Sequence, residues 1–525
     1  MSDNITIVYL LNTPLENDYK HTLYFASASA QASYFTGCLV HSFSNFTYQR
    51  KDNIIRVPKH FDELRNCNYV MYQNRQYTNK WFYAFITKME YVSDGRTDIY
   101  IETDVVQTWM FDYQVKQSFI EREHVNDDTI GIHTVPESLE TGEYIINGKN
   151  KNASLNLHTL VIASTLDLNA DDYKDADGVA GGMYNGIYSG VRYYKVDNTQ
   201  ANTIIEKLAK AGRSEAIVSI FVVPSLFVDS LIPSGKTYHE VSINTPVQKM
   251  DWVNTFGVDD TENFKPKNLN GYKPKNNKLF TFPYCYMLMT NNSGGSAIYH
   301  YEYFNNPNDA EHCAFYIYAS ITPGMSITIS PRHYKGVDIN SNERLNLGKF
   351  PICSWNTDVY TNWLTQNAVN IPLQLGSSAV GLGTNIATGN AFGVFDGVMG
   401  IANTLGSIYQ HSLIPPQAEG NINSGDVAFS SGILTFTAYQ MTIKKEYAQI
   451  IDKYFDMFGY KVNMVKTPNK NHRENYWFIK TIDANITGAI PMNDMQKIKE
   501  CYNKGITFWK HASNIKDYSV SNKIV

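Results

Sequence analysis

The sequence lacks the short motifs that mark common catalytic and metal sites. Its 525 residues contain no GxxxxGK[ST] loop for nucleotide phosphates, no HExxH pair for zinc and no GxSxG turn for a serine nucleophile. The six cysteines include no CxxC pair, so we expect reduced thiols rather than a disulfide framework or a zinc site. We therefore expect no enzyme activity, no cofactor and no metal.

The chain also has little net charge and no basic leader. Its formal net charge of −5 argues against a protein that grips nucleic acid by neutralising phosphates, although DNA could still slide past such a surface. The opening MSDNITIVYLLNTP has no basic residue before its short apolar run. We expect this stretch to form a first strand rather than a signal peptide.

The most unusual absence is that of charge between residues 359 and 418. This stretch contains no Lys or Arg, and Asp396 is its only formally charged residue. A flexible Gly-rich linker would be less apolar, which leaves a hairpin buried in the core or a conditional membrane segment. The apolar side chains that we expect to contact a membrane are Phe392, Val394, Phe395, Val398, Met399, Ile401, Leu405 and Ile408.

Glycines are spaced regularly through the same stretch. Gly389, Gly393 and Gly397 form two overlapping GxxxG spacings, and Gly400 follows, so flexibility and close packing of backbones are both expected. Asp396 inside a lone membrane helix would cost about 2.5–3.5 kcal/mol. The membrane interpretation therefore requires several copies, with Asp396 facing a water-filled pore.

The rest of the chain is rich in β-branched and aromatic residues. The pattern predicts a mainly β fold with a few helices. Expected strands cover 5–11, 79–92, 97–111, 157–165, 216–224, 296–304, 314–331, 432–443 and 476–490, with a turn at Ser93-Asp94-Gly95. Helices are expected at 199–211, before Gly459 and from Pro491 to Gly505. Polar and Pro/Gly-rich stretches suggest boundaries that divide the chain into 1–150, 151–358, 359–418 and 419–525.

Three weak candidates for metal-binding or catalytic sites have simpler structural interpretations. Asp175, Asp177 and Gly178 fit three positions of a calcium loop, but tyrosines occupy its first and twelfth positions, so an acidic surface turn is favoured. Glu121, Glu123 and His124 could exchange protons, but solvated charges at a strand end are the simpler expectation. The pair Asp171-Asp172 is equally unspecific for a glycosidase.

Several long motifs nevertheless resemble one known family. NDYKHTLYFASASAQASYF (17–35), YVMYQNRQYTNKWFYAFITKMEY (69–91), DVVQTWMFDY (104–113) and SFIEREHV (118–125) occur in the first part of the chain. FGYKVNMVKTPN (458–469), NYWFIKT (475–481) and GITFWK (505–510) follow in the same order near its end. This pattern is similar to the tail knob, or distal tail tube, proteins of short-tailed bacteriophages of the phi twenty-nine type, which infect Gram-positive bacteria.

The resemblance implies a structural virion protein at the tail tip. It implies a homohexameric, β-barrel-like tube (1–150 and 419–525) with an inserted β-rich knob (151–358) and a long apolar loop (359–418). The loop would plug the tube and, on infection, insert into the host cytoplasmic membrane to make a channel for double-stranded DNA. Expected partners are the lower collar or tail tube and a peptidoglycan-degrading tip protein, and the chain would be made in the host cytoplasm. A receptor-binding or wall-binding adhesin, whose aromatic middle block stacks on sugars, remains the alternative, and a wall-degrading enzyme has only acidic clusters in its favour.

Overall fold

The structure is a computed structural model, and it describes most of the chain outside the proposed plug segment. The described residues are 5–49, 51–74, 80–151, 158–174, 182–184, 187–189, 191–213, 216–227, 239–240, 247–250, 265–305, 313–319, 323–348, 350, 352–357, 417–419 and 434–525. The candidate membrane residues, the glycines at 389–400 and Asp396 all lie outside these ranges, as do Asp175, Asp177 and Gly178 of the possible calcium loop.

The chain divides into two compact units. Unit 1 contains 1–140, 274–279 and 446–525, and unit 2 contains 141–273 and 280–445. Unit 2 is therefore inserted into unit 1, and a six-residue segment in the middle of the insertion belongs to unit 1. The proposed division into four parts remains a prediction.

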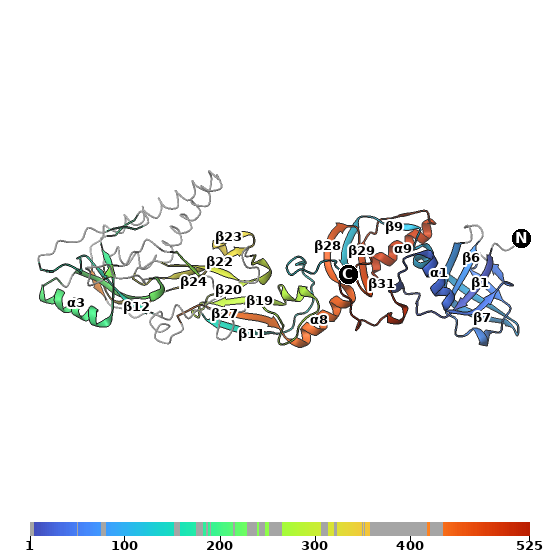
Figure 1. The fold of residues 1–525 in the computed structure, drawn as a ribbon, viewed down its shortest axis with the longest axis horizontal. Helices are drawn as coiled ribbons and strands as arrows, with labels where there is room; N and C mark the ends of the chain where they lie inside the picture. The colour runs from blue at the N-terminus through green and yellow to red at the C-terminus, as the bar shows by residue number, and fades with distance from the viewer. Residues whose placement is uncertain are drawn as a thin grey trace. The chain divides into compact units, whose positions relative to one another are not determined.

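Two large sheets form most of the described part of unit 1 (Figure 1). The seven-stranded sheet has the order β3-β1-β6-β7-β8-β5-β4, and the five-stranded sheet has the order β2-β31-β29-β10-β28. The strands are β1 (Ile5–Leu11), β2 (His21–Leu23), β3 (Leu39–Phe43), β4 (Thr47–Gln49), β5 (Ile54–Val57), β6 (Tyr69–Asn74), β7 (Lys80–Ser93), β8 (Arg96–Thr103), β10 (Ser118–Glu123), β28 (Tyr460–Lys466), β29 (Tyr476–Ile482) and β31 (Ile506–Trp509), with β9 (Tyr113–Val115) and β30 (Ile486–Gly488) paired separately. The five-stranded sheet thus joins two N-terminal strands to three C-terminal ones.

The described part of unit 1 also contains the helices α1 (Ala28–Gly37), α2 (Val105–Trp109), α8 (Lys445–Phe458) and α9 (Met492–Lys504). One buried apolar cluster includes Val8 and Trp109 from the N-terminal part together with Trp477, Ile498 and Phe508 from the C-terminal part. The two ends of the chain therefore share one core.

Unit 2 is also mainly β. Its sheets have the orders β11-β27-β19-β20, β17-β15-β12-β16-β25-β26 and β18-β21-β22-β23, with β24 added to β22 and β13 paired to β14. The bounds are β11 (Tyr144–Lys151), β12 (His158–Ser164), β13 (Gly182–Tyr184), β14 (Ile187–Ser189), β15 (Arg192–Val196), β16 (Ile217–Pro224), β17 (His239–Glu240), β18 (Val247–Met250), β19 (Cys285–Thr290), β20 (Ser296–Tyr299), β21 (Ala314–Ala319), β22 (Ile327–Tyr334), β23 (Val337–Ile339), β24 (Leu345–Leu347), β25 (Ile352–Thr357), β26 (Gln417–Glu419) and β27 (Thr437–Ile443). The helix α3 (Asn198–Lys210) packs Ile204 and Leu208 into a core with Ile162 and Tyr194.

The mainly β fold class and the helix positions predicted from the sequence are confirmed. Helices α3, α8 and α9 end before Gly212, Gly459 and Gly505, and each of these glycines has a positive φ (68°, 63° and 95°), which a glycine adopts without a steric penalty. The predicted hairpin is the β7–β8 pair, in which Ser93 faces Arg96 across Asp94 and Gly95.

The expected strand over 97–111 is wrong in its second half. Strand β8 ends at Thr103, because Asp104 accepts hydrogen bonds from the amides of Val106 and Gln107 and begins helix α2. A buried capping carboxylate therefore overrides the strand propensity of Val105 and Val106. The expected strands over 296–304 and 476–490 are also shorter, since β20 ends at Tyr299 and β29 at Ile482.

The five cysteines with described surroundings, Cys38, Cys67, Cys285, Cys313 and Cys501, are free thiols, as expected.

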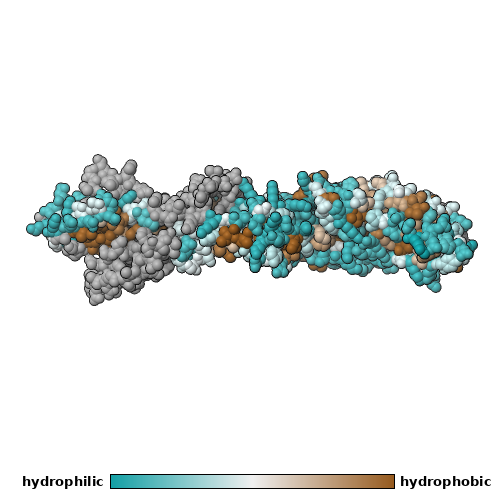
Figure 2. Space-filling model, turned by 90° about the horizontal axis from the view of Figure 1, so that it is seen from below, coloured by the Kyte–Doolittle hydropathy of each residue, from teal (hydrophilic) through white to brown (hydrophobic). Residues whose placement is uncertain are grey.

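Over the part of the chain that the structure describes, none of the helices has the length and apolar character needed to cross a bilayer. Hydrophobic residues reach the surface in separate patches between hydrophilic ones (Figure 2).

Candidate functional site: a carboxylate clamp and a surface pocket

Four carboxylates of unit 1 bind the short segment Pro274–Leu279. We call this arrangement, formed by Asp128, Glu137, Asp452 and Asp456, the carboxylate clamp. Each residue from Lys275 to Lys278 in the segment donates at least one hydrogen bond to it. The clamp therefore attaches the only part of the 141–445 insertion that belongs to unit 1.

Asp452 is the centre of the clamp on helix α8. Its carboxylate accepts the amides of Lys275 (2.8 Å) and Asn276 (3.1 Å) and the side-chain amide of Asn276 (2.9 Å). Asp456, one turn later, accepts the Asn276 side chain at 2.9 Å and pairs with the ammonium of Lys275 at 3.0 Å. Buried backbone donors need acceptors, so this spacing of two acids on one helix holds the segment against α8.

Glu137 is a second anchor and is almost completely buried. It forms ion pairs with Arg122 and Lys278, whose side chains are also buried, and accepts the backbone amide of Lys461 at 2.9 Å. Arg122 also donates to the carbonyl of Gly459 at 2.7 Å and lies over the ring of Tyr454. Burial lowers the pKa of Lys278, while the Glu137 charge opposes this effect.

Asp128 completes the clamp. Its carboxylate accepts the amide of Asn277 (3.0 Å) and the hydroxyl of Tyr460 (2.6 Å), and its carbonyl accepts the side-chain amide of Asn277 (2.8 Å). Burial raises the pKa of Asp128, and the donated hydrogen bonds of Asn277 and Tyr460 offset part of that rise. Acceptors and donors are thus matched around the segment.

The expectation that Glu123 and His124 are solvated at a strand end is wrong. Both are buried at the end of β10. Glu123 pairs with Lys466 at 2.5 Å and accepts the backbone and side-chain amides of Asn469. The His124 ring accepts the amide of Phe478 (2.7 Å) at Nδ1, and its Nε2 lies 3.0 Å from the carbonyl of Asp456. Both groups are structural, because each is fully engaged in hydrogen bonds within the protein.

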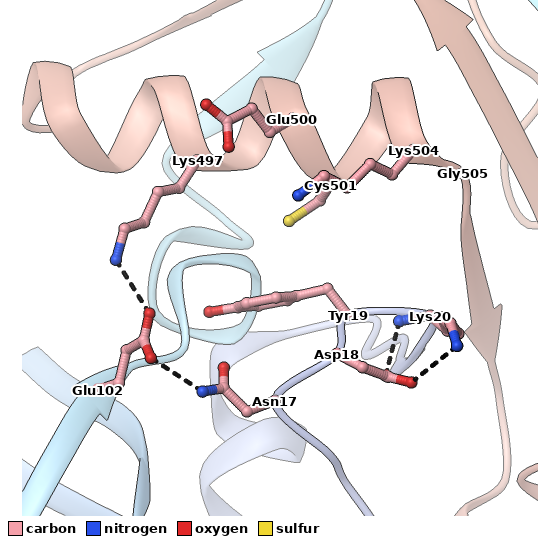
Figure 3. A pocket seen from close by; sticks show the side chains of 10 residues that line it. All are labelled: Asn17, Asp18, Tyr19, Lys20, Glu102, Lys497, Glu500, Cys501, Lys504 and Gly505. Atoms are coloured by element: carbon pink, nitrogen blue, oxygen red, sulfur yellow. Dashed lines mark hydrogen bonds and ion pairs between the residues drawn. The ribbon is translucent and has the colours of Figure 1, made fainter. Parts of the chain in front are cut away.

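A surface pocket of about 460 Å³ lies elsewhere in unit 1 (Figure 3). Its lining consists of Asn17, Asp18, Tyr19, Lys20, Glu102, Lys497, Glu500, Cys501, Lys504 and Gly505. Glu102 is held by Lys497 (3.1 Å) and Asn17 (2.9 Å), and Tyr19, with a φ of 54°, donates its hydroxyl hydrogen to the carbonyl of Thr103. Three acids face three lysines, so the pocket selects neither anions nor cations by charge.

Neither place has the groups that a catalytic site needs. The thiol of Cys501 in the pocket has its pKa raised to about 12 by burial, so it remains protonated and a poor nucleophile. Among the described residues, no group of three or more His, Cys, Asp or Glu side chains is arranged to hold a metal ion. The clamp carboxylates are engaged by the segment 274–279 and by neighbouring groups of unit 1.

The sequence alone did not predict the carboxylate clamp. The candidate membrane residues, Phe392 to Ile408, lie outside the described residues, so their arrangement remains a prediction. The clamp acids are scattered over 128–456 without a local motif. The only local signal was the pair Asp452 and Asp456, whose four-residue spacing places both on one face of a helix.

Two family models match this chain. Residues 249–523 match the model of the C-terminal domain of tail knob protein gp9 of Bacillus phage phi29. Residues 3–114 match the model of the N-terminus of caudoviral major tail proteins.

Individual proteins are similar over nearly the full length. The tail knob protein gp9 of Bacillus phage B103 is 28% identical over 98% of this chain and 97% of its own length. The tail knob protein gp9 of Bacillus phage phi29 is 27% identical, with 98% of each chain covered. The solved tail knob protein gp12 of bacteriophage C1 shares the fold, with a TM-score of 0.64 at 16% identity over 99% of this chain and 100% of that one.

Proposed function

Because this chain belongs to the phi29 tail knob protein family, we propose that it forms the distal end of the phage tail and encloses the path of the genome. Its relatives are structural tail proteins, and the chain is accordingly a structural, non-enzymatic component of the virion tail. The observation that carries the proposal is the similarity to tail knob proteins over 98% of the chain.

The proposed assembly is a ring of six copies whose wall is made by unit 1. The match of residues 3–114 to major tail proteins supports assigning unit 1 to the tube. The inserted unit 2 would then form the outer knob. Other tail proteins, such as a collar or tube component and a wall-degrading tip protein, would bind the same particle.

The proposed plug and membrane segment is 359–418. A stretch with one charge in 60 residues is poorly solvated, so six copies would cover one another's apolar side chains inside the tube. After release, lipid would replace the sister copies, and Asp396 would face the water-filled channel rather than acyl chains. The apolar side chains of the segment would thus be buried in protein before release and in the host membrane afterwards.

Dye release from liposomes tests this proposal with the full-length protein. We expect the wild-type protein to release the dye. The double variant F395D/V398D should release it at least ten-fold more slowly, because the added charges oppose insertion into the bilayer. The matched control I205D changes an exposed apolar residue of α3 and should release dye as wild type does. An absence of release by wild type at pH 5 and pH 7.5 would remove the membrane role.

A wall-binding role for unit 2 is the second candidate. The ring of His300 is stacked between Phe282 (4.1 Å between centroids) and Tyr303 (4.9 Å), and Phe282 is exposed. Such an aromatic surface can stack on sugar rings. Sedimentation with purified host cell wall tests it: F282A should reduce the bound fraction, while the distant control I205A should not.

A further inference from the structure

A second and smaller pocket opens on unit 1. Its volume is about 60 Å³, and it shares no lining residue with the pocket of Figure 3. Its lining consists of Tyr24, Met110, Tyr113, Lys470, Trp477, Tyr502 and Phe508. Five of these seven side chains are aromatic, and Lys470 is the one charged residue among the described residues of the lining. The pocket therefore combines apolar walls with a single cation.

Trp477 brings a buried hydrogen-bond donor to this pocket. The residue is 1% exposed, and within the described chain its Nε1 has no hydrogen-bond partner. Packing fixes the indole, because it stacks on Phe508 across the β29–β31 ladder at 5.6 Å between ring centroids and meets Tyr24 edge-on at 5.0 Å. Burying an N–H group without an acceptor is costly, so the indole favours a bound group that accepts its hydrogen.

The hydroxyls of Tyr113 and Tyr502 provide a second donor. They lie 3.3 Å apart, and both residues are buried. Only one of the two hydroxyls can donate to the other, so the second keeps its hydrogen for another acceptor. Strand β9 and helix α9 carry these two tyrosines, so the positions of the hydroxyls are set by regular secondary structure.

Lys470 brings a positive charge that has no counterion among the described residues. It reaches solvent from the loop between β28 and β29. The surrounding protein nevertheless lowers the pKa of its ammonium, and no nearby acid opposes this effect. A bound anion would supply the missing negative charge.

The size and the walls of the pocket restrict the kind of anion. One water needs about 10–15 Å³ in this measure, so the pocket holds a group of only a few atoms, about the size of acetate. A phosphate group would place several of its oxygens against aromatic rings that offer no donor, which is unfavourable. A carboxylate has only two oxygens, and the carbon attached to it can lie against the rings.

We propose that this pocket binds a carboxylate. One carboxylate oxygen pairs with the ammonium of Lys470, and the other accepts hydrogens from the indole of Trp477 and from the tyrosine pair. The apolar walls exclude water and strengthen these charge-assisted hydrogen bonds. The carboxylate belongs either to a free short-chain acid or to an acidic side chain of a partner protein.

Saturation-transfer difference NMR on the full-length protein tests the proposal with acetate as the probe. Acetate should give a saturable signal from its methyl protons, and methylammonium should give none. Lys470→Gln should raise the Kd for acetate at least five-fold. Lys453→Gln removes an exposed lysine of α8 that does not line the pocket, so it is the matched control and should bind acetate as wild type does. Tyr502→Phe keeps the ring and should raise the Kd at least two-fold.

Two further probes identify the source of the carboxylate and its specificity. Saturable binding of aspartate capped as N-acetyl-aspartate N-methylamide would assign the site to an acidic side chain, whereas binding of acetate alone would assign it to a free acid. Displacement of acetate by phosphate or chloride at matched ionic strength would overturn the assignment to a carboxylate. Equal Kd values for wild type and K470Q, or no saturable acetate signal, would overturn the site itself.

Discussion

The ammonium of Lys278 forms an ion pair with the carboxylate of Glu137, and the two side chains are only 3% and 1% exposed. The pair joins the segment 274–279 to a loop 141 residues earlier in the chain. Because Arg122 pairs with the same carboxylate, one acid neutralises two buried cations. Glu137 therefore anchors the segment 274–279 within unit 1 through a buried network of two ion pairs.

Replacing Glu137 by alanine should be strongly destabilising. The variant leaves Arg122 and Lys278 buried without their partner, which should lower the free energy of unfolding by about 3–5 kcal/mol in urea titrations. The control Glu143→Ala breaks an exposed pair with Lys444 and should cost at most about 1 kcal/mol. Equal losses for both variants would contradict the role of Glu137.

Replacing Asp452 by alanine should release the clamped segment. Two backbone amides and the Asn276 side chain lose their acceptor, so local opening of 274–279 should become more frequent. Tryptic cleavage after Lys275 and Lys278 should become at least ten-fold faster, as measured by mass spectrometry. Asp517→Ala, which removes an exposed acid, should leave the cleavage rate unchanged, and equal rates in wild type and D452A would refute the clamp.

His124 should make unit 1 sensitive to acid. Burial, together with the charge of Arg473, lowers its folded pKa to about 3 from an ordinary value of 6.5. The folded state therefore binds fewer protons, so the stabilisation is complete above pH 6.5 and is lost as the pH falls toward 3. The stability advantage of wild type over His124→Gln should shrink by about 1.4 kcal/mol per pH unit between pH 6 and pH 4. A difference that does not vary with pH would show that His124 does not cause the acid sensitivity.

Gly459→Ala should cost much more than Gly212→Ala. Both glycines follow helices with positive φ, but a Cβ at Gly459 would lie 2.1 Å from the carbonyl oxygen of Glu123, whereas no atom lies within 4 Å of one at Gly212. We expect a loss of about 1 kcal/mol at Gly212 and about 3 kcal/mol or more at Gly459 in thermal or urea unfolding. Similar losses would mean that the contact with β10 relaxes easily.

Much of the fold could be predicted because its signals are local. The apolar periodicity before Gly459 and the proline and glycine at 491 and 505 predict helices that the structure confirms as α8 and α9. Local signals failed where a distant contact decided the outcome. At 104–109, strand-forming valines are helical because the Asp104 carboxylate is buried with the hydroxyl of Tyr69 and caps α2.

The sequence by itself determined the mainly β class, the helix ends, the uncharged segment and the resemblance to tail knob proteins, since these depend on residue type and short spacing. Only the tertiary structure decided that 274–279 belongs to unit 1 and that Asp128, Glu137, Asp452 and Asp456 surround it. The reason is physical, because buried donors and charges pair with the acceptors that the tertiary fold places next to them. Asn276, for example, donates to Asp452, which is 176 residues away in the sequence. The periodicity of residue types along the sequence does not predict such a long-range hydrogen bond.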